Sequence, residues 1–174
     1  SGTTGLQKGV MLLHSNIVSN CITALSLVDI RREVISLSYL PFSHIYARTT
    51  EYYGGLKTGL TIAFAENIQK IPENFLEISP TLFFSVPRLF EKVYTKIQEN
   101  LGDSIIKEKL FKWAIGVGKE YNLNNKKDLI TTIQYKIAEK LVFSKIKAKM
   151  GGRVRLCVTG GGPMAKEILE FFYS

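Results

Sequence analysis

The first nine residues combine the side chains and backbone that bind phosphate groups. A glycine-rich loop can bend its backbone N–H groups around an anion, hydroxyl side chains add further donors, and a lysine neutralises the charge. The stretch is not a Walker A loop, because that pattern places Ser or Thr directly after Gly-Lys, whereas Lys8 here precedes Gly9. It predicts a cradle for a triphosphate, made by Ser1, Gly2, Thr3, Thr4, Gly5, Lys8 and Gly9.

A second glycine-rich stretch lies near the end of the chain. Gly160, Gly161, Gly162 and Pro163 follow a predicted strand and precede a predicted helix. With Ala165 they fit Gly-x-Gly-x-x-Ala, the spacing of a dinucleotide-binding turn. That interpretation requires an acidic residue about 20 positions further on, and the chain ends at Ser174. A nucleotide- or NAD-binding module therefore stays open as one alternative.

The remaining reactive side chains are few and scattered. Ser43 and His44 are neighbours without a marked third partner for a catalytic triad. His14 is the other histidine, and no cysteine cluster accompanies either, so a zinc site is not indicated. Cys21 and Cys157 lie far apart in apolar surroundings, which predicts two reduced thiols rather than a disulfide.

The elements that must position these residues are predicted from hydrophobic patterning. Strands are expected over 34–40, 60–64, 81–86 and 153–158, and helices from 15 onward and over 43–57, 67–78, 87–101, 103–121, 127–149 and 163–173. Strands that alternate with helices predict an α/β fold of parallel-sheet crossover units. Within the helical block, an apolar stripe is expected to face the core; it consists of Ile130, Ile133, Ile137, Leu141 and Val142.

The charge of the chain is concentrated in the helical block. The net charge is +8, and residues 92–149 hold 13 lysines against six acidic residues. A solvated lysine-rich face is the simplest interpretation, and contact with an anionic membrane surface is the alternative. No nucleic acid is expected as a partner, since no arginine-rich run or basic strand with interleaved aromatic residues occurs. No apolar run approaches the length of a membrane span.

Several motifs together resemble one enzyme family. Ser1–Val10 resembles the phosphate-binding signature of the adenylate-forming enzymes, which include acyl-CoA synthetases, luciferases and peptide-synthetase adenylation domains; Gln7 stands where that family usually has proline. Leu40–Arg48 resembles a segment of the long-chain fatty acyl-CoA synthetases. Val86–Tyr94 resembles the segment that those enzymes place before a helical insertion.

The resemblance continues to the end of the chain. The insertion itself is similar over 109–121 and 141–146, and smaller members of the superfamily generally lack it. Thr159–Met164 resembles a later Ser-Gly-Gly-Ala-Pro-Leu turn, with Gly162 where alanine is usual. The fold implied is a fragment of the large N-terminal domain of an adenylate-forming enzyme, with a helical insertion.

This resemblance implies a two-step reaction. A fatty carboxylate attacks the α-phosphate of ATP to give an acyl-adenylate and pyrophosphate, and the thiol of CoA then displaces AMP. By resemblance, the opening loop would hold the β- and γ-phosphates, and Thr3 or Thr4 would help to ligate Mg²⁺. His44 would be the catalytic residue that faces the acyl carboxylate and α-phosphate, and the turn 160–163 would border adenosine and the acyl group.

The expected organisation is a partial AMP-binding domain over 1–174. Residues 1–86 would carry the phosphate loop and α/β units, 87–149 the helical insertion, and 150–174 the returning strand, glycine turn and helix. The chain alone is expected to be inactive, and the parent enzyme to be cytoplasmic, with peripheral membrane contact through the basic insertion. Two further alternatives stay open: a ligase for aryl or shorter acids, and a non-catalytic basic helical interaction module.

Overall fold

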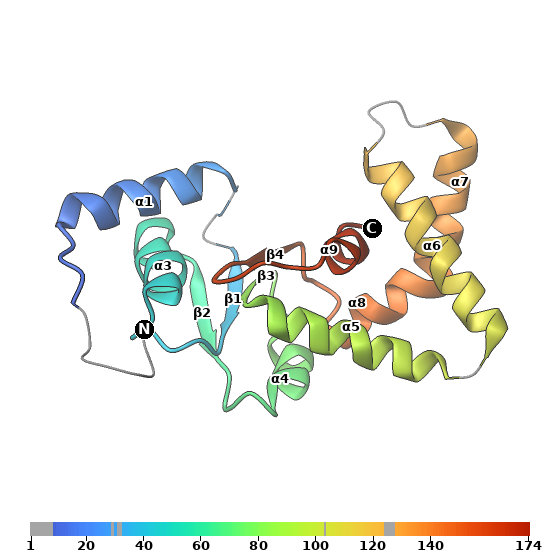
Figure 1. Ribbon diagram of the computed structural model, residues 1–174, viewed down its shortest axis with the longest axis horizontal. Helices are drawn as coiled ribbons and strands as arrows, with labels where there is room; N and C mark the ends of the chain where they lie inside the picture. The colour runs from blue at the N-terminus through green and yellow to red at the C-terminus, as the bar shows by residue number, and fades with distance from the viewer. Residues whose placement is uncertain (1–8, 29, 31–32, 103, 124–127) are drawn as a thin grey trace.

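A computed structural model describes residues 9–28, 30, 33–102, 104–123 and 128–174. Its centre is a four-stranded sheet (Figure 1). The strands are β1 (Ile35–Ser38), β2 (Thr61–Phe64), β3 (Leu82–Ser85) and β4 (Leu156–Thr159), in the order β2-β1-β3-β4. All neighbours pair in parallel, with Leu37 opposite Ala63 and Phe84 opposite Val158. The predicted α/β fold with parallel crossover units is confirmed.

The helices form two groups around the sheet. Near β1 and β2 lie α1 (His14–Ser26), α2 (Ile45–Ala47), the π-helix η1 (Arg48–Tyr53) and α3 (Gly54–Thr58) (Figure 1). On the other side follow α4 (Ile71–Ile78), α5 (Pro87–Leu101), α6 (Ile105–Leu123), α7 (Leu129–Ala138), the π-helix η2 (Glu139–Phe143), α8 (Ser144–Lys149) and α9 (Lys166–Tyr173). No helix among these described segments is both long and apolar enough to cross a membrane.

The helix boundaries follow local chemistry where the sequence supplies a clear signal. Helix α5 begins at Pro87, whose missing N–H costs nothing in the first turn, and ends before Gly102 with φ +59°. The side chain of Asp128 caps α7 by accepting a hydrogen bond from the backbone N–H of Thr131 at 3.1 Å. The predicted helix over 87–101 is therefore confirmed at both ends.

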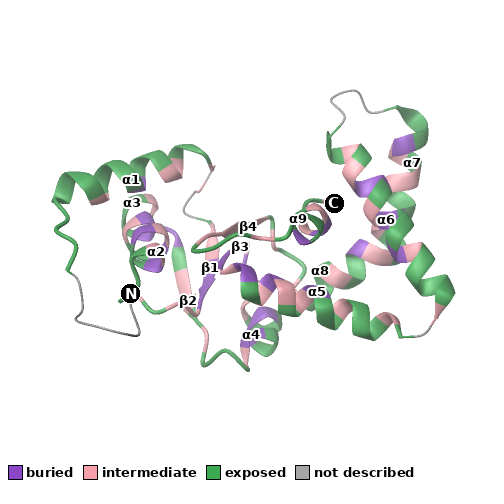
Figure 2. Cartoon of the chain, in the orientation of Figure 1, coloured by how far each residue is buried: buried purple, intermediate pink, exposed green. Residues whose placement is uncertain are grey.

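The core lies on both faces of the sheet, since successive strand residues point in opposite directions. Leu37 and Phe83 belong to a cluster that includes buried residues of α4, α5, α6 and α9. Leu82 and Phe84 belong to a second cluster on the opposite face. Figure 2 shows the buried residues gathered on β1, β3 and the inner sides of these helices.

Two predicted single helices contain π-helical turns. The segment expected as one helix over 43–57 is built from α2, η1 and α3, and the segment over 127–149 from α7, η2 and α8. A π-turn inserts an extra residue per turn and so shifts which side chains face the core. A search for 3.6-residue periodicity cannot register such an insertion.

The apolar stripe of the last long helix is not core, which corrects the prediction. Ile130, Ile133, Ile137 and Leu141 are 42–67% exposed, and Val142 is half-buried. The residues of α7 that are buried are Thr131 and Ala138, and Ala138 belongs to a cluster with Ala114 and Val117 of α6. Small side chains allow α6 and α7 to approach closely, and the larger stripe is left on the outside.

Replacing Gly151 by alanine is expected to destabilise the chain by about 3 kcal/mol, because a side chain there meets both backbone strain and a clash. Gly151 has φ +77°, and an added Cβ would lie 2.3 Å from the Phe75 carbonyl oxygen and 2.7 Å from Ser79 Cα. Gly152 is the matched control, with φ +72° and no atom within 4 Å. Urea unfolding followed by circular dichroism should show Gly152→Ala losing only about 1 kcal/mol; equal losses would contradict the clash.

Candidate functional site

Two loops that carry predicted site residues leave the same edge of the sheet. The loop from Tyr39 to His44 follows β1, and the turn from Gly160 to Pro163 follows β4. Because all four strands are parallel, their carboxyl ends lie at one edge, which is where α/β sheets bind ligands. The structure therefore brings His44 and the glycine turn to a common edge.

The His44 side chain is anchored on one ring nitrogen and exposed on the other. His44 is the N-cap of α2, and its Nδ1 accepts a hydrogen bond from the backbone N–H of Tyr46 at 3.2 Å. Nδ1 therefore carries no proton, and Nε2 carries the ring N–H. Nε2 has no partner among the described residues, and the residue is exposed. His44 thus offers one oriented donor to an oxygen of a ligand.

Tyr46 joins the His44 loop to the glycine turn. Its hydroxyl donates a hydrogen bond to the Val158 carbonyl oxygen at 3.3 Å. Its ring packs on Gly160, where an added Cβ would lie 2.5 Å from Cε2 and 2.9 Å from Cζ. The room that glycine leaves at position 160 is therefore taken up by the Tyr46 ring. A ligand could therefore contact Gly160 only through its backbone, and that contact stays a prediction.

The next residues of the turn are open. Gly161 has φ +82°, and Cβ atoms built at Gly161 and Gly162 would meet only single side-chain carbons, each at 3.9 Å. No acceptor among the described residues takes a hydrogen bond from the backbone N–H of either glycine. With Pro163, these residues are exposed. Free N–H groups beside open space fit an anionic or planar ligand.

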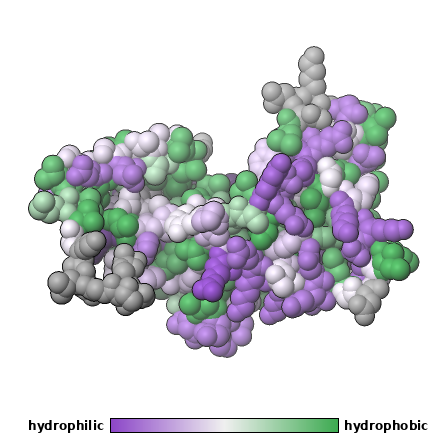
Figure 3. All heavy atoms as spheres, viewed as in Figure 1, coloured by the Kyte–Doolittle hydropathy of each residue, from purple (hydrophilic) through white to green (hydrophobic). Residues whose placement is uncertain are grey.

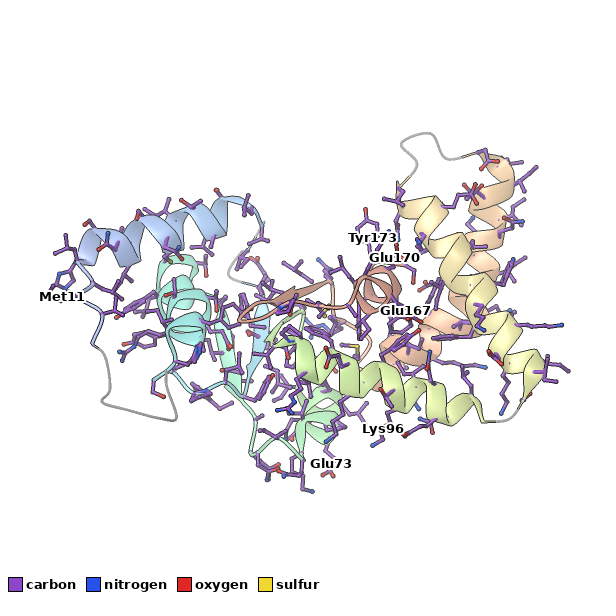
Figure 4. All side chains as sticks on the ribbon, viewed as in Figure 1. Met11, Glu73, Lys96, Glu167, Glu170 and Tyr173 are labelled. Atoms are coloured by element: carbon purple, nitrogen blue, oxygen red, sulfur yellow. The ribbon has the colours of Figure 1, made fainter. Side chains whose placement is uncertain are left out.

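Most of the predicted phosphate-binding loop cannot be placed relative to this edge of the sheet. Ser1, Gly2, Thr3, Thr4, Gly5 and Lys8, including both predicted magnesium ligands, lie outside the described residues. Gly9 is described; it is exposed, and a Cβ built there would have no atom within 4 Å. Met11, two residues later, lies beside the start of α1 (Figure 4). A Cβ built at Gly9 therefore contacts neither His44 nor the glycine turn.

A buried carboxyl group behind this edge is absent from the sequence-based predictions. Glu51 lies in η1 and is 0% exposed, and neither carboxylate oxygen has a hydrogen-bond partner in the described chain. Burial raises the pKa of Glu51 to about 7, and the neighbouring Ser38 hydroxyl opposes the shift. Ala47, Glu51 and Gly55 are all buried, but no motif in the sequence marks Glu51 as one of the buried positions.

Further buried or half-buried polar groups lie on or next to β1, β3 and β4. The hydroxyls of Ser36, Ser38 and Thr159 are also buried without a partner among the described residues. Tyr39 shares a hydrogen bond of 2.8 Å with Ser85 Oγ, and burial raises the pKa of Tyr46 to about 12, with the Glu51 charge adding to the shift. Several polar groups of this region are therefore buried, and burial favours the neutral form of Glu51 and of Tyr46.

The two cysteines do not take part in this arrangement. Both are free thiols, as predicted. Burial raises the pKa of Cys157 to about 11 and also raises that of Cys21. A thiol held protonated is a poor nucleophile, so neither residue is a candidate for covalent chemistry.

Comparisons with known proteins agree over the whole chain. The family model of the AMP-binding enzymes matches residues 1–174. Long chain acyl-CoA synthetase 7 (peroxisomal) of Arabidopsis thaliana is 35% identical over 98% of this chain. A long-chain-fatty-acid–CoA ligase of Xenopus laevis is 38% identical over 100% of the chain. The matches cover 24% and 25% of those proteins, so the chain spans about a quarter of the length of the relatives.

A solved structure shows the same fold. The adenylation domain of a carboxylate reductase from Mycobacterium chelonae aligns with 90% of this chain and 21% of its own, at a TM-score of 0.54 and 22% identity. The family match runs through the glycine turn and the helical block alike, which favours neither a separate dinucleotide-binding module nor a separate basic interaction module. The chain belongs to the AMP-binding enzyme family.

Proposed function

We propose that this chain is part of a long-chain fatty-acid–CoA ligase, which forms an acyl-adenylate from ATP and a fatty acid and then passes the acyl group to CoA. One observation carries the substrate class: relatives named as long-chain ligases match the chain from end to end, including the helical block 87–149. A ligase for aryl or shorter acids is the competing proposal, and the helical block argues against it.

The edge of the sheet supplies groups suited to the first step. A fatty carboxylate is already ionised and nucleophilic, so the enzyme must align it and neutralise developing phosphate charge rather than remove a proton. The free Nε2–H of His44 would donate to a carboxylate or α-phosphate oxygen. The N–H groups of Gly161 and Gly162, which have open space beside them, would border the adenylate.

The opening loop completes the proposal. Thr3, Thr4 and the backbone of Gly2 and Gly5 would hold the β- and γ-phosphates, with Lys8 offsetting their charge. Thr3 or Thr4 would help to ligate Mg²⁺, which supplies further neutralisation of phosphate charge when bound. Proline has no N–H, so Gln7 in its place removes no phosphate ligand.

Pyrophosphate release tests the proposal directly. The full-length protein should release pyrophosphate from ATP with long-chain acids, and acyl-CoA should appear when CoA is added. Pyrophosphate release only with aryl or short-chain acids would reject the proposed substrate class. If no carboxylic acid supports pyrophosphate release, the proposed ligase activity is wrong. The 174-residue chain by itself is expected to release none.

Lys8→Ala in the full-length protein is expected to weaken ATP use roughly tenfold, because one charge-assisted contact to phosphate is lost. Folding should be unaffected, and the KM for the fatty acid should change little. Steady-state pyrophosphate release at varied ATP measures the effect. Unchanged kcat and KM for ATP would remove Lys8 from its proposed role.

The proposed location is the cytoplasm, with peripheral contact to a membrane through the basic helical block. The excess of lysines over acidic residues in 92–149 supports attraction to anionic lipid. Sedimentation of the full-length protein with anionic vesicles at low salt tests the contact, and failure to co-sediment would reject it.

A further inference from the structure

A large apolar cavity lies between α4, α5, α6 and α8. Its volume is about 860 Å³. Beneath its lining lie Phe75, Phe83, Phe90 and Phe111, which are only 2–6% exposed because they are packed in the main core cluster. Because Phe83 is a residue of β3, the cavity reaches down to the sheet. Pockets of several hundred cubic ångströms are of the size that holds a whole small ligand.

Lysines line this cavity, and none of the described residues that line it is acidic. Lys92 and Lys96 lie one turn apart on α5, and Lys145 and Lys149 lie one turn apart on α8. Lys107 of α6 also lines it. All five are exposed, and none forms an ion pair in the part of the chain that the structure describes. Figure 3 shows polar side chains gathered over α4 and α5, and Lys96 is labelled in Figure 4.

The apolar and charged parts come from the same helices. On α5, Leu89, Val93 and Ile97 line the cavity at four-residue spacing, beside the lysine pair. On the opposite wall, Ile146 lies beside the other lysine pair. Like charges one turn apart repel each other, so an anion placed between the two pairs would relieve repulsion on both helices.

We propose that this cavity binds a single-chain anionic amphiphile as a monomer, with its alkyl chain along the apolar wall formed by Leu89, Val93 and Ile97 and its head group between the lysine pairs. Charge complementarity favours an anionic head group, since the described residues that line the cavity include five lysines and no carboxylate. The hollow shape favours one inserted chain as the occupant, because a flat bilayer surface would not reach the apolar side chains inside the cavity. Neither His44 nor any residue of the glycine turn lines the cavity, so the proposal does not depend on the proposed activity.

Binding of dodecyl phosphate to the full-length protein tests this site. The probe has an alkyl chain and an anionic head but no carboxylate, so it cannot be converted to an acyl-adenylate. Isothermal titration calorimetry below the micelle concentration should show saturable binding. Replacing Lys92 and Lys96 by glutamate should weaken it roughly tenfold or more, because two charge-assisted contacts are lost.

The matched control reverses Lys136 and Lys140, which are also exposed and four residues apart but do not line the cavity. These substitutions should leave dodecyl phosphate binding unchanged. Val93→Trp should weaken binding by narrowing the cavity at its apolar wall without changing charge. The proposal would be overturned if dodecyl phosphate shows no saturable binding. It would also be overturned if reversing Lys92 and Lys96 has no effect, or the same effect as reversing Lys136 and Lys140.

Two further readouts separate this site from its competitors. If the Lys92 and Lys96 reversal weakens binding to phosphatidylserine vesicles and leaves dodecyl phosphate binding intact, the occupant is a membrane and the proposal is wrong. Pyrophosphate release with palmitate is measured on the same variants and should be retained. Failure of the proposed ligase function would appear in that assay and not in the binding of the probe.

Discussion

Replacing Glu51 by glutamine is expected to stabilise the 174-residue chain by about 3 kcal/mol at pH 8 and by little near pH 4. The folded-state pKa of Glu51 is raised to about 7 from 4.5, mainly by burial. Between these two pH values the folded state therefore holds more protons than the unfolded state. Stability contributed at this site is full below pH 4.5, falls as pH rises to about 7, and stays low above it.

Urea unfolding of the chain and of Glu51→Gln between pH 4 and pH 8 measures this difference. The quantity of interest is how the difference in free energy of unfolding changes with pH, so the intrinsic cost of burying a glutamine cancels. Glu77→Gln on the exposed face of α4 is the matched control and should show a flat difference. A flat difference for Glu51→Gln as well would mean that its carboxylate is solvated or paired when ionised.

The order of the strands and helices could be predicted from the sequence more accurately than their boundaries. Alternating apolar runs and helical patterns were enough to predict four parallel strands, since each crossover must be made by a helix. Strand 153–158 was expected three residues before β4 begins at Leu156, because Arg153 and Arg155 alternate with apolar residues in a strand-like pattern. The last helix begins at Lys166 rather than at Pro163, because the glycine turn extends to Ala165.

The sequence motifs predicted which residues belong to the candidate site, but not how these residues contact one another. The motifs pointed to His44 and to the glycine turn, which lie more than a hundred residues apart in sequence. Their connection through Tyr46 depends on strand order, since β3 lies between β1 and β4 and only a side chain can reach across. Glu51 was missed because a lone acidic residue in a polar-looking helix is ordinarily solvated, and the π-turn that helps to bury it leaves no periodic signal.

Gly160→Ala is expected to lower kcat/KM for the fatty acid in the full-length enzyme roughly ten- to a hundredfold, because a displaced Tyr46 moves the His44 loop. The added methyl group would lie 2.5 Å from the Tyr46 ring, which is held by the hydrogen bond to Val158. Pyrophosphate release with palmitate measures the loss. Gly162→Ala is the control, since its methyl group would have space and alanine is the residue usual in the family turn.

A double-mutant cycle assigns the loss to this contact rather than to strain in the turn. In a Tyr46→Leu background the ring is absent, so Gly160→Ala should cost only a fewfold in kcat/KM, and the two substitutions should be strongly non-additive. Tyr46→Phe removes the hydrogen bond to Val158 and keeps the ring, so Gly160→Ala should remain costly there. If Gly160→Ala costs the same in all three backgrounds, glycine is required at position 160 for the ligand or the turn, and Tyr46 does not position the His44 loop.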